Sequence, residues 1–287
     1  SERLKEWKSR LERLNRKEIK GIYLTAYSAG NINKMSEVVD LINKTELNAV
    51  VIDIKDYSGH ILYDSNVPLV NELDMEDYRI NRLGDLIKVL HKYDIYVIAR
   101  QTVFQDPLLA QKKPEWALKN TSGEMWRDNK GLVWVDPTRK EVWDYNIEIA
   151  REAAKLGFDE INFDYVRFPS DGNMLTLAYN NGKQKKYEVM GDFFSYLNEQ
   201  MSDLPVNTSL DMFGFVMEKN GEDDMNIGQR LQDGLGKVDA IAPMMYPSHY
   251  PFGHLGLDNP ADYPGLVIEN GMQKGASRFN GAGTALR

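Results

Sequence analysis

Cysteine is absent from this sequence of 287 residues. Its absence excludes disulfide bonds, thiolate zinc sites and cysteine nucleophiles, although it leaves the cellular compartment open. Histidine is scarce, and two of the four histidines, His249 and His254, flank a loop without the HExxH spacing of a zinc peptidase. Uninterrupted apolar runs stay below the roughly 18 to 20 residues of a membrane helix, so we expect no membrane segment in this chain.

Positive charge is also in deficit, since 35 lysines and arginines face 43 aspartates and glutamates, for a net charge of −8. Such a surface repels a phosphate backbone, and we expect no nucleic-acid partner. The GxSxG elbow, the GxxxxGKS phosphate loop and the dinucleotide fingerprint are missing from the sequence. These absences exclude the common serine hydrolases, P-loop enzymes and dehydrogenases.

What the sequence does contain is a regular alternation of apolar runs and amphipathic stretches. Hydrophobic residues make up 42% of the chain, which is enough for a buried core. Residues 1–18 place Leu4, Leu11 and Leu14 on one face among charges, which predicts a charged amphipathic helix or spacer before a domain at 19–287. Strands are predicted at 21–28, 48–56, 95–101, 160–168, 205–213 and 238–246, and helices at 34–46, 79–92, 139–156, 184–202, 223–235 and 260–275.

Six β-then-α units in a row predict a parallel sheet with outer helices, which fits both a doubly wound sheet and a β/α barrel. The polarity within the strands favours the barrel. Asn162 and Asp164 share one phase of their strand, and Ser209 and Asp211 share one phase of the next. Polar side chains on one face near a strand end suit a barrel rim, whereas both faces of an open parallel sheet pack against helices. We therefore predict an α/β fold of the TIM-type (β/α)8 barrel.

Two of the eight β/α units expected for such a barrel have no counterpart in the sequence. We expect a barrel that is truncated or that lacks its last two β/α units, and we favour truncation because an open barrel would expose a strand edge. The seventh strand should begin where the chain stops. The loops after the second and third predicted strands are long, about 22 and 35 residues, and long loops at one end of a barrel usually carry function. This asymmetry predicts a site at the C-terminal ends of the strands.

The strongest local pattern is GFDEINFDYVRFPSDG at residues 157–172. Asp164 ends the predicted strand, and Arg167 is near enough in sequence to keep this carboxylate ionised. Sugar hydrolysis needs a second carboxyl group about 5 to 9.5 Å away, and Asp211 holds the matching position on the next strand. Asp164 as nucleophile and Asp211 as general acid/base are therefore the candidate catalytic residues. The alternatives are that Asp164 only pairs with Arg167 or caps a loop, and that Asp211 is a structural hydrogen-bond acceptor.

Further candidates would hold substrate at the same rim. Asp53 and Lys55 share a phase of the second strand, so they either form an ion pair that closes the lumen or grip substrate hydroxyls. Arg100 ends the third strand, where it would set the charge of nearby carboxylates, and Arg167 completes the charged set. Aromatic residues offer rigid faces for sugar rings, although any one of them is more often a core residue. The aromatic candidates are Tyr57, Trp126, Trp134 and Tyr246.

Four segments in this order, GIYLTAYSAG, VVIDIKDYSG, the stretch from VWVDPTRK to FDYVRFPSDG, and IAPMMYPSHY, resemble a bacterial family of predicted glycoside hydrolases long catalogued as a domain of unknown function. The resemblance spans about residues 20–287, and FDYVRFP is its most specific motif. It implies a TIM-like barrel, distantly similar to the α-amylase and α-galactosidase type, whose nucleophile ends strand four; here that residue is Asp164. Related barrels place the acid/base after strand five or six. Asp211 fits the first arrangement, while strand six offers Tyr246 but no carboxylate.

Three functional hypotheses follow. The first is a glycoside hydrolase that cleaves a polysaccharide or oligosaccharide and needs no cofactor or metal; it requires a raised pKa on Asp211, which burial beside Asp164 would supply. The second is a carbohydrate-binding barrel of the cell surface without turnover. The third is a metal-dependent hydrolase or deacetylase that uses aspartates with His249 or His254. Members of the family that the sequence resembles are often exported or attached to the cell surface, so we expect that location here.

Overall fold

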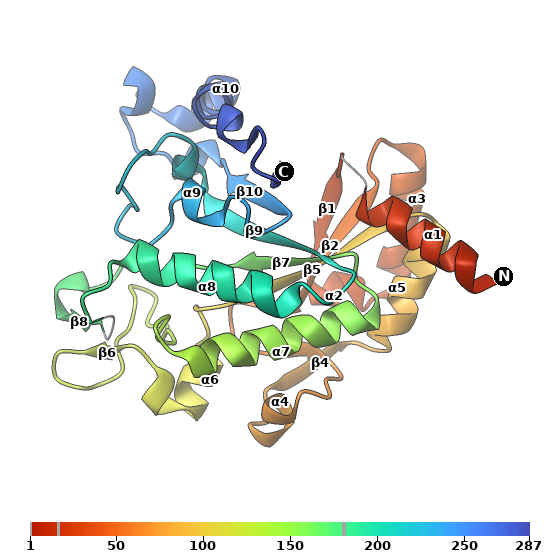
Figure 1. The fold of residues 1–287 in the computed structure, drawn as a ribbon, viewed down its shortest axis with the longest axis horizontal. Helices are drawn as coiled ribbons and strands as arrows, with labels where there is room; N and C mark the ends of the chain where they lie inside the picture. The colour runs from red at the N-terminus through yellow and green to blue at the C-terminus, as the bar shows by residue number, and fades with distance from the viewer. Residues whose placement is uncertain (1, 16–17, 180–181) are drawn as a thin grey trace.

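The computed structural model describes residues 2–15, 18–179 and 182–287 of the chain (Figure 1). Its centre is a parallel sheet, as predicted, with the strand order β1-β2-β5-β7-β9-β10-β11. These strands are β1 (Gly21–Leu24), β2 (Ala49–Lys55), β5 (Tyr96–Thr102), β7 (Glu160–Asp164), β9 (Asn207–Phe213), β10 (Ala240–Met244) and β11 (Ala285–Leu286). The first six coincide with the predicted strands, and β11 starts the seventh position. The TIM-type α/β fold is confirmed.

Helices cover the outside of this sheet, and α7 and α8 pack against each other across its front in Figure 1. The long helices are α1 (Glu2–Leu14), α3 (Ile32–Lys44), α5 (Leu83–Lys92), α7 (Lys140–Leu156), α8 (Lys186–Met201) and α10 (Pro264–Gly275). The short ones are α2 (Ala26–Ala29), α4 (Pro68–Glu72), α6 (Pro107–Lys112) and α9 (Leu231–Gly234). Single 3₁₀ turns lie at Pro114–Trp116, Met174–Thr176, Gly214–Met217, Pro247–His249, His254–Gly256, Pro260–Asp262 and Ala276–Phe279.

Three differences from the predicted elements have local causes. The helix predicted at 223–235 is wrong except for α9, because Met225 and Asn226 have φ angles of 55° and 60°, which a right-handed helix does not contain. The fourth strand stops at Asp164 because Tyr165 also has a positive φ, 52°. The long segment after β2 is not a plain loop. It forms β3 (Ile61–Tyr63), antiparallel to β2, and β4 (Glu76–Ile80), parallel to β3, so the next helix begins later than predicted.

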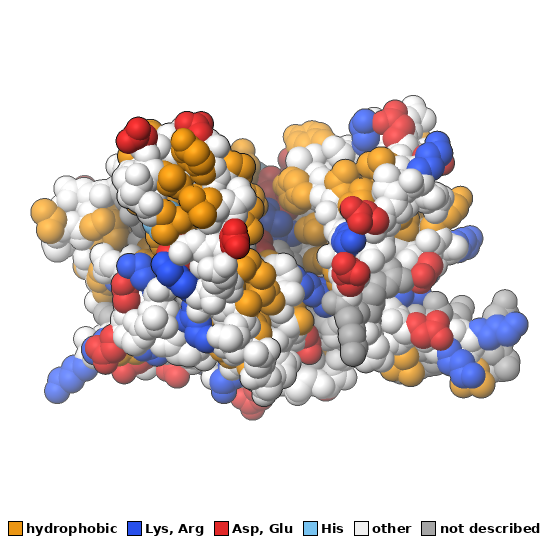
Figure 2. Space-filling view, turned by 90° about the horizontal axis from the view of Figure 1, so that it is seen from above, with side chains coloured by type: hydrophobic (Ala, Val, Ile, Leu, Met, Phe, Trp, Pro, Cys, Tyr) orange, Lys and Arg blue, Asp and Glu red, His pale blue; other side chains and the backbone are white. Residues whose placement is uncertain are grey.

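The sheet is open between β1 and β11 within the part of the chain that the structure describes. In Figure 1 these edges lie on either side of a gap, with the C-terminus near β10. The space-filling view from above shows a deep cleft between the same two sides of the molecule, and both acidic and basic side chains are visible inside it (Figure 2). The inner face of the sheet is therefore reachable from solvent.

A bulge in β2 separates two residues that the sequence predicted on one face. Asp53 pairs with Arg100 of β5, but Lys55 pairs with the very next residue, so Ile54 is skipped and the alternation reverses. Asp53 faces the lumen, whereas Lys55 is fully buried with Nζ 2.7 Å from Oδ2 of Asp106. The prediction that Asp53 and Lys55 share a face is wrong, and Lys55 has no exposed atoms with which to touch a substrate.

The first helix, α1, lies against the N-terminal ends of the strands. Nε of Arg13 donates to Oδ1 of Asp159, 3.0 Å away, while His91 lies 2.9 Å from the other oxygen of that carboxylate. Asp159 is buried, and although burial by itself raises the pKa of a carboxyl group, the bonds to His91, Val97 and Arg13 lower the pKa of Asp159 below its usual value. The predicted amphipathic helix is thus attached to the barrel by an ion pair at the N-terminal ends of the strands. The C-terminal ends, where the sequence predicts the site, lie on the opposite side of the barrel.

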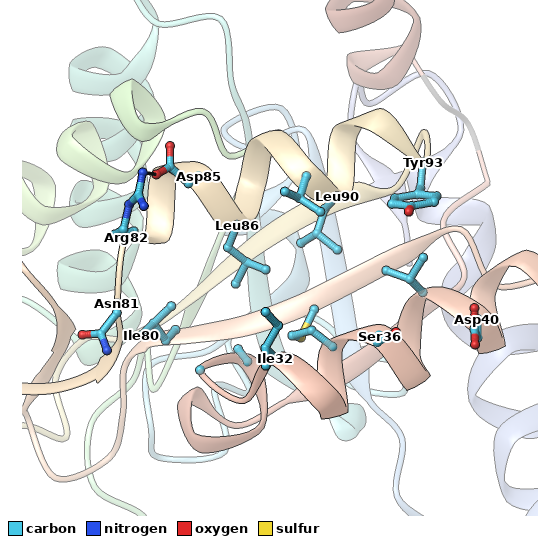
Figure 3. Close-up of a pocket in the computed structure, with 15 residues that line it drawn as sticks. Ile32, Ser36, Asp40, Ile80, Asn81, Arg82, Asp85, Leu86, Leu90 and Tyr93 are labelled. Carbon is cyan, nitrogen blue, oxygen red and sulfur yellow. Dashed lines mark ion pairs between the residues drawn. The ribbon is translucent and has the colours of Figure 1, made fainter.

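A second hollow of about 640 Å³ lies outside the sheet, between α3 and α5 (Figure 3). Apolar side chains from both helices, such as Ile32 and Leu86, line it, and Arg82 and Asp85 form an ion pair at its edge. Among the described helices, none combines the length and the hydrophobicity that a membrane span requires.

Candidate active site

Four charged residues meet at the C-terminal ends of neighbouring strands, and Arg100 of β5 is their centre. Its Nη1 donates to Oδ1 of Asp53 at 2.8 Å, its Nη2 donates to Oδ2 of Asp164, and its Nε lies 4.0 Å from Oδ2 of Asp211. We call Asp53, Asp164 and Asp211 the carboxylate cluster. Burial on its own lowers the pKa of Arg100, but the charges of Asp164 and Asp53 outweigh it and raise that pKa above its usual value. Arg100 is therefore a permanent cation shared by the cluster.

Asp164 is held through both of its oxygens. Oδ2 accepts from Arg100, and Oδ1 accepts from the backbone N–H of Tyr165 at 2.6 Å. Tyr165 itself has a left-handed backbone, a conformation that costs a bulky residue about 1 to 3 kcal/mol. The two hydrogen bonds hold the carboxylate at the end of strand β7. The sequence predicted Arg167 as the partner of Asp164; the structure gives that place to Arg100.

Asp211 has a different environment. Its Oδ1 accepts from Nδ2 of Asn162 at 2.9 Å, and its side chain is 17% exposed. Burial, followed by the negative charge of Asp164, raises the pKa of Asp211 to about 7, against the opposing effects of Asn162 and Arg100. This is the direction that a general acid needs near neutral pH. These two carboxyl groups of the cluster thus have different environments: Asp164 accepts a hydrogen bond through each oxygen, whereas Asp211 accepts one from Asn162 and has a raised pKa.

The raised pKa of Asp211 makes the stability of the fold depend on pH. In the unfolded chain an aspartate ionises near pH 3.9, so between about pH 4 and 7 the folded state binds more protons than the unfolded one and stability falls as pH rises. Asp211→Asn removes the group that must ionise. We expect thermal unfolding of this variant to match the parent near pH 4 and to occur several degrees higher at pH 8. A difference in melting temperature that does not change with pH would contradict the assignment.

Two tyrosines complete the rim. The hydroxyl of Tyr23, on β1, donates to Oδ2 of Asp53, and its ring lies 5.7 Å from the guanidinium carbon of Arg100. Burial and the charge of Asp53 raise the pKa of Tyr23 well above its usual value, so it remains a donor. Tyr246 is half-exposed, and burial together with the charges of Asp211 and Asp164 raises its pKa. The sequence predicted Tyr246 but missed Tyr23, because the predicted strand 21–28 contains no charged side chain that would have pointed to the site.

The remaining predicted residues lie elsewhere. Trp126 and Trp134 are each 2% exposed, so the prediction that they form open platforms for sugars is wrong. The indole N–H of Trp126 donates to the carbonyl of Asn173, and that of Trp134 donates to Asp128, which fixes both rings inside the folded loops. Tyr57 is 60% exposed in the turn after β2, and its role as a platform stays a prediction.

A pocket of about 370 Å³ opens beside the carboxylate cluster. Its charged lining residues are Asp164 and Arg167, and its walls include the rings of Tyr165, Phe213, Phe215 and Tyr250. The rings of Phe215 and Tyr250 contact each other with centroids 4.5 Å apart. A cavity of this size with apolar walls and a few charged groups is typical of a small-ligand site. The described residues contain no cluster of three or more side chains arranged to hold a metal ion.

Comparison with known proteins identifies the family. Residues 21–287 match the family model described as "Putative glycosyl hydrolase domain". The chain belongs to this glycosyl hydrolase family. A crystal structure of a hypothetical protein from Ruminiclostridium thermocellum is 42% identical, with a TM-score of 0.61, over 65% of this chain and 96% of that one. No curated protein sequence matches the chain.

More distant structures share the fold of this chain. An α-galactosidase from Thermus thermophilus is 15% identical, with a TM-score of 0.53, over 88% of this chain and 50% of that one. Trehalose-6-phosphate hydrolase from Bacillus licheniformis is 14% identical, with a TM-score of 0.55, over 94% of this chain and 56% of that one. The chain spans about half the length of these two enzymes. The family resemblance inferred from the sequence is confirmed.

Proposed function

We propose that this domain hydrolyses glycosidic bonds with Asp164 as the nucleophile or charge-stabilising carboxylate and Asp211 as the general acid/base. The observation that carries the proposal is the position of Arg100, which contacts both side chains and so places both at one point of the rim. Carboxyl groups joined in this way lie on the scale of the separations of about 5 to 9.5 Å that glycosidases use. The different environments of the two groups suit the two roles.

The reaction follows from those roles. Asp211, protonated, gives its proton to the glycosidic oxygen as the bond to the anomeric carbon breaks, and Asp164 either attacks that carbon or stabilises its positive charge. Asp211, now ionised, then takes a proton from water as the water attacks the anomeric carbon. Arg100 balances negative charge within the cluster throughout, and Asp53 with Tyr23 fixes the orientation of Arg100. No cofactor or metal takes part in these steps.

A polysaccharide or oligosaccharide outside the cell or on its surface is the proposed substrate. The open cleft supports this, because it leaves the inner face of the sheet reachable for a chain of sugars (Figure 2). The exposed rings of Tyr23 and Tyr246 lie beside the carboxylate cluster and can stack on sugar faces, a role that we also propose for the exposed ring of Tyr57.

The test is release of reducing ends from a panel of neutral and acidic glycans, with the double variant Asp164→Asn, Asp211→Asn as background. We expect at least one glycan to be cleaved by the parent and not by the double variant. Saturable binding of a glycan without any release would instead favour a carbohydrate-binding role. On a cleaved substrate, the anomer that first appears by NMR distinguishes retention from inversion.

A further inference from the structure

Arg167 is a buried cation that has no carboxylate partner among the described residues. Arg167 is 8% exposed, and three aromatic rings surround its guanidinium group. Its guanidinium carbon lies 5.0 Å from the ring centroid of Trp134, 5.2 Å from that of Tyr165 and 4.8 Å from that of Phe213. Aromatic faces compensate part of the cost of burying a charge, but a buried cation without an anion remains unfavourable.

The hydrogen bonds of Arg167 leave one edge of its guanidinium free. Nη1 donates to the carbonyl of Phe168 at 3.0 Å and lies 3.4 Å from Oγ of Ser170. Nε and Nη2 make no hydrogen bond with the described residues, and neither is sealed from solvent. These two nitrogens form the edge of the guanidinium that binds a carboxylate through two parallel hydrogen bonds.

The pocket beside Asp164 is the space that this residue lines. The other strong cation of the rim, Arg100, is already engaged by Asp53 and Asp164. The titratable groups that share the pocket lining with Arg167 are Asp164, Tyr165, His249 and Tyr250. Arg167 is therefore the arginine that lines the pocket, and among the described residues no carboxylate forms an ion pair with it.

We propose that Arg167 binds the carboxylate of a uronic acid unit in this pocket, so that the substrate is an acidic glycan. The inference rests on the proposed function in one respect: the pocket beside Asp164 is taken as a sugar subsite. A planar carboxylate matches the free edge of Arg167, and the flanking rings of Tyr165 and Phe213 offer apolar surface to the sugar ring. Sulfate esters carry the same sign of charge but a different shape, and the experiment distinguishes them from uronates.

The experiment measures binding without turnover. Calorimetric titration at fixed ionic strength compares D-glucuronate and D-galacturonate with glucose, galactose and glucose 6-sulfate. We expect one uronate to bind at least about tenfold more tightly than its neutral counterpart and than the sulfate ester, as a charge-assisted pair of hydrogen bonds should provide. Arg167→Gln should abolish this preference, and Arg167→Lys should keep only part of it, because lysine retains the charge but not the fork.

Arg151→Gln is the matched control, because that guanidinium is already paired with Asp203 on the outer surface. It should leave the preference for uronate unchanged. Circular dichroism establishes that each variant is folded, and the lysine variant serves if the glutamine variant is not. Equal affinity for acid and neutral sugar, no binding of either, tighter binding of the sulfate ester, or a preference that survives Arg167→Gln would each overturn the proposal.

These outcomes are separable from failure of the proposed function. Uronate binding that depends on Arg167, in a protein whose activity survives Asp164→Asn, would support the subsite and remove the proposed catalytic role. Cleavage of a neutral glycan that depends on Asp164, with no preference for uronate, would support catalysis and overturn the inference about Arg167.

Discussion

Replacing Asp164 by asparagine should reduce turnover by about 10⁴-fold or more, the scale at which loss of one member of a catalytic unit acts. Asparagine keeps the size of the side chain and an oxygen for Arg100, but it has neither the nucleophilicity nor the charge of the carboxylate. The measurement is kcat on whichever glycan or aryl glycoside the parent cleaves. Turnover within tenfold of the parent would remove Asp164 from the mechanism.

Asp203→Asn is the matched control for this variant. Asp203 is also an aspartate paired with an arginine, Arg151, but it lies on the outer surface. Its replacement should leave kcat unchanged. Azide provides a sharper distinction between a nucleophile and a positioning residue. In Asp164→Ala, added azide should restore product formation and appear in the product as a glycosyl azide, whereas a residue that only orients Arg100 would give no such adduct.

Replacing Asp211 by asparagine should have the second-largest effect, and its signature is a pH profile. Because burial and the charge of Asp164 raise the pKa of Asp211 to about 7, kcat/KM of the parent should fall as pH rises above that value and the acid loses its proton. The Asp211→Asn variant should show no alkaline limb. Its rate on substrates with poor leaving groups should fall by roughly 10²- to 10⁴-fold. With dinitrophenyl glycosides, whose leaving group departs without protonation, the rate should fall far less.

Asn162→Ala is the control for the origin of that limb. The bond from Asn162 to Asp211 lowers the pKa of Asp211, so its removal should move the alkaline limb to higher pH without deleting it. An alkaline limb that is identical in parent, Asp211→Asn and Asn162→Ala would show that another group titrates, and Asp211 would lose the role of acid.

The order of strands and helices could be predicted from the sequence because each element has its own hydrophobic period. Local irregularities of the backbone that involve one or two residues could not be predicted. The bulge at Ile54 leaves no mark in the apolar pattern, yet it moves Lys55 from the lumen to the core. The left-handed pair Met225 and Asn226 lies inside a stretch whose spacing otherwise suits a helix, although Asn226 and the nearby Gly228 are residue types that favour a positive φ.

The carboxylate cluster itself was predictable, since Asp53, Asp164 and Asp211 lie near strand ends in the polar phase. The sequence also predicted that Arg100 would set the charge of nearby carboxylates, but it did not predict the contact with Asp164, because proximity in sequence suggested Arg167 as the partner of Asp164. Neighbouring strands instead bring Arg100 there, and this requires knowledge of the register. The burial of Trp126 and Trp134 depends on loops that fold back on themselves through isolated bridges such as Arg127 to Val133, which no periodic pattern encodes.

Strand β7 is tied to distant parts of the chain at both of its ends. Before its first residue Asp159 is bound by Arg13, its first residue Glu160 is bound by Arg287, and its last residue Asp164 is bound by Arg100. Local opening of this strand must break ion pairs to the first helix, to the residue that follows β11 and to the centre of the sheet at once. Local opening of the segment that carries the proposed nucleophile therefore has a high free-energy cost. Its amide hydrogens should exchange only when the whole domain unfolds.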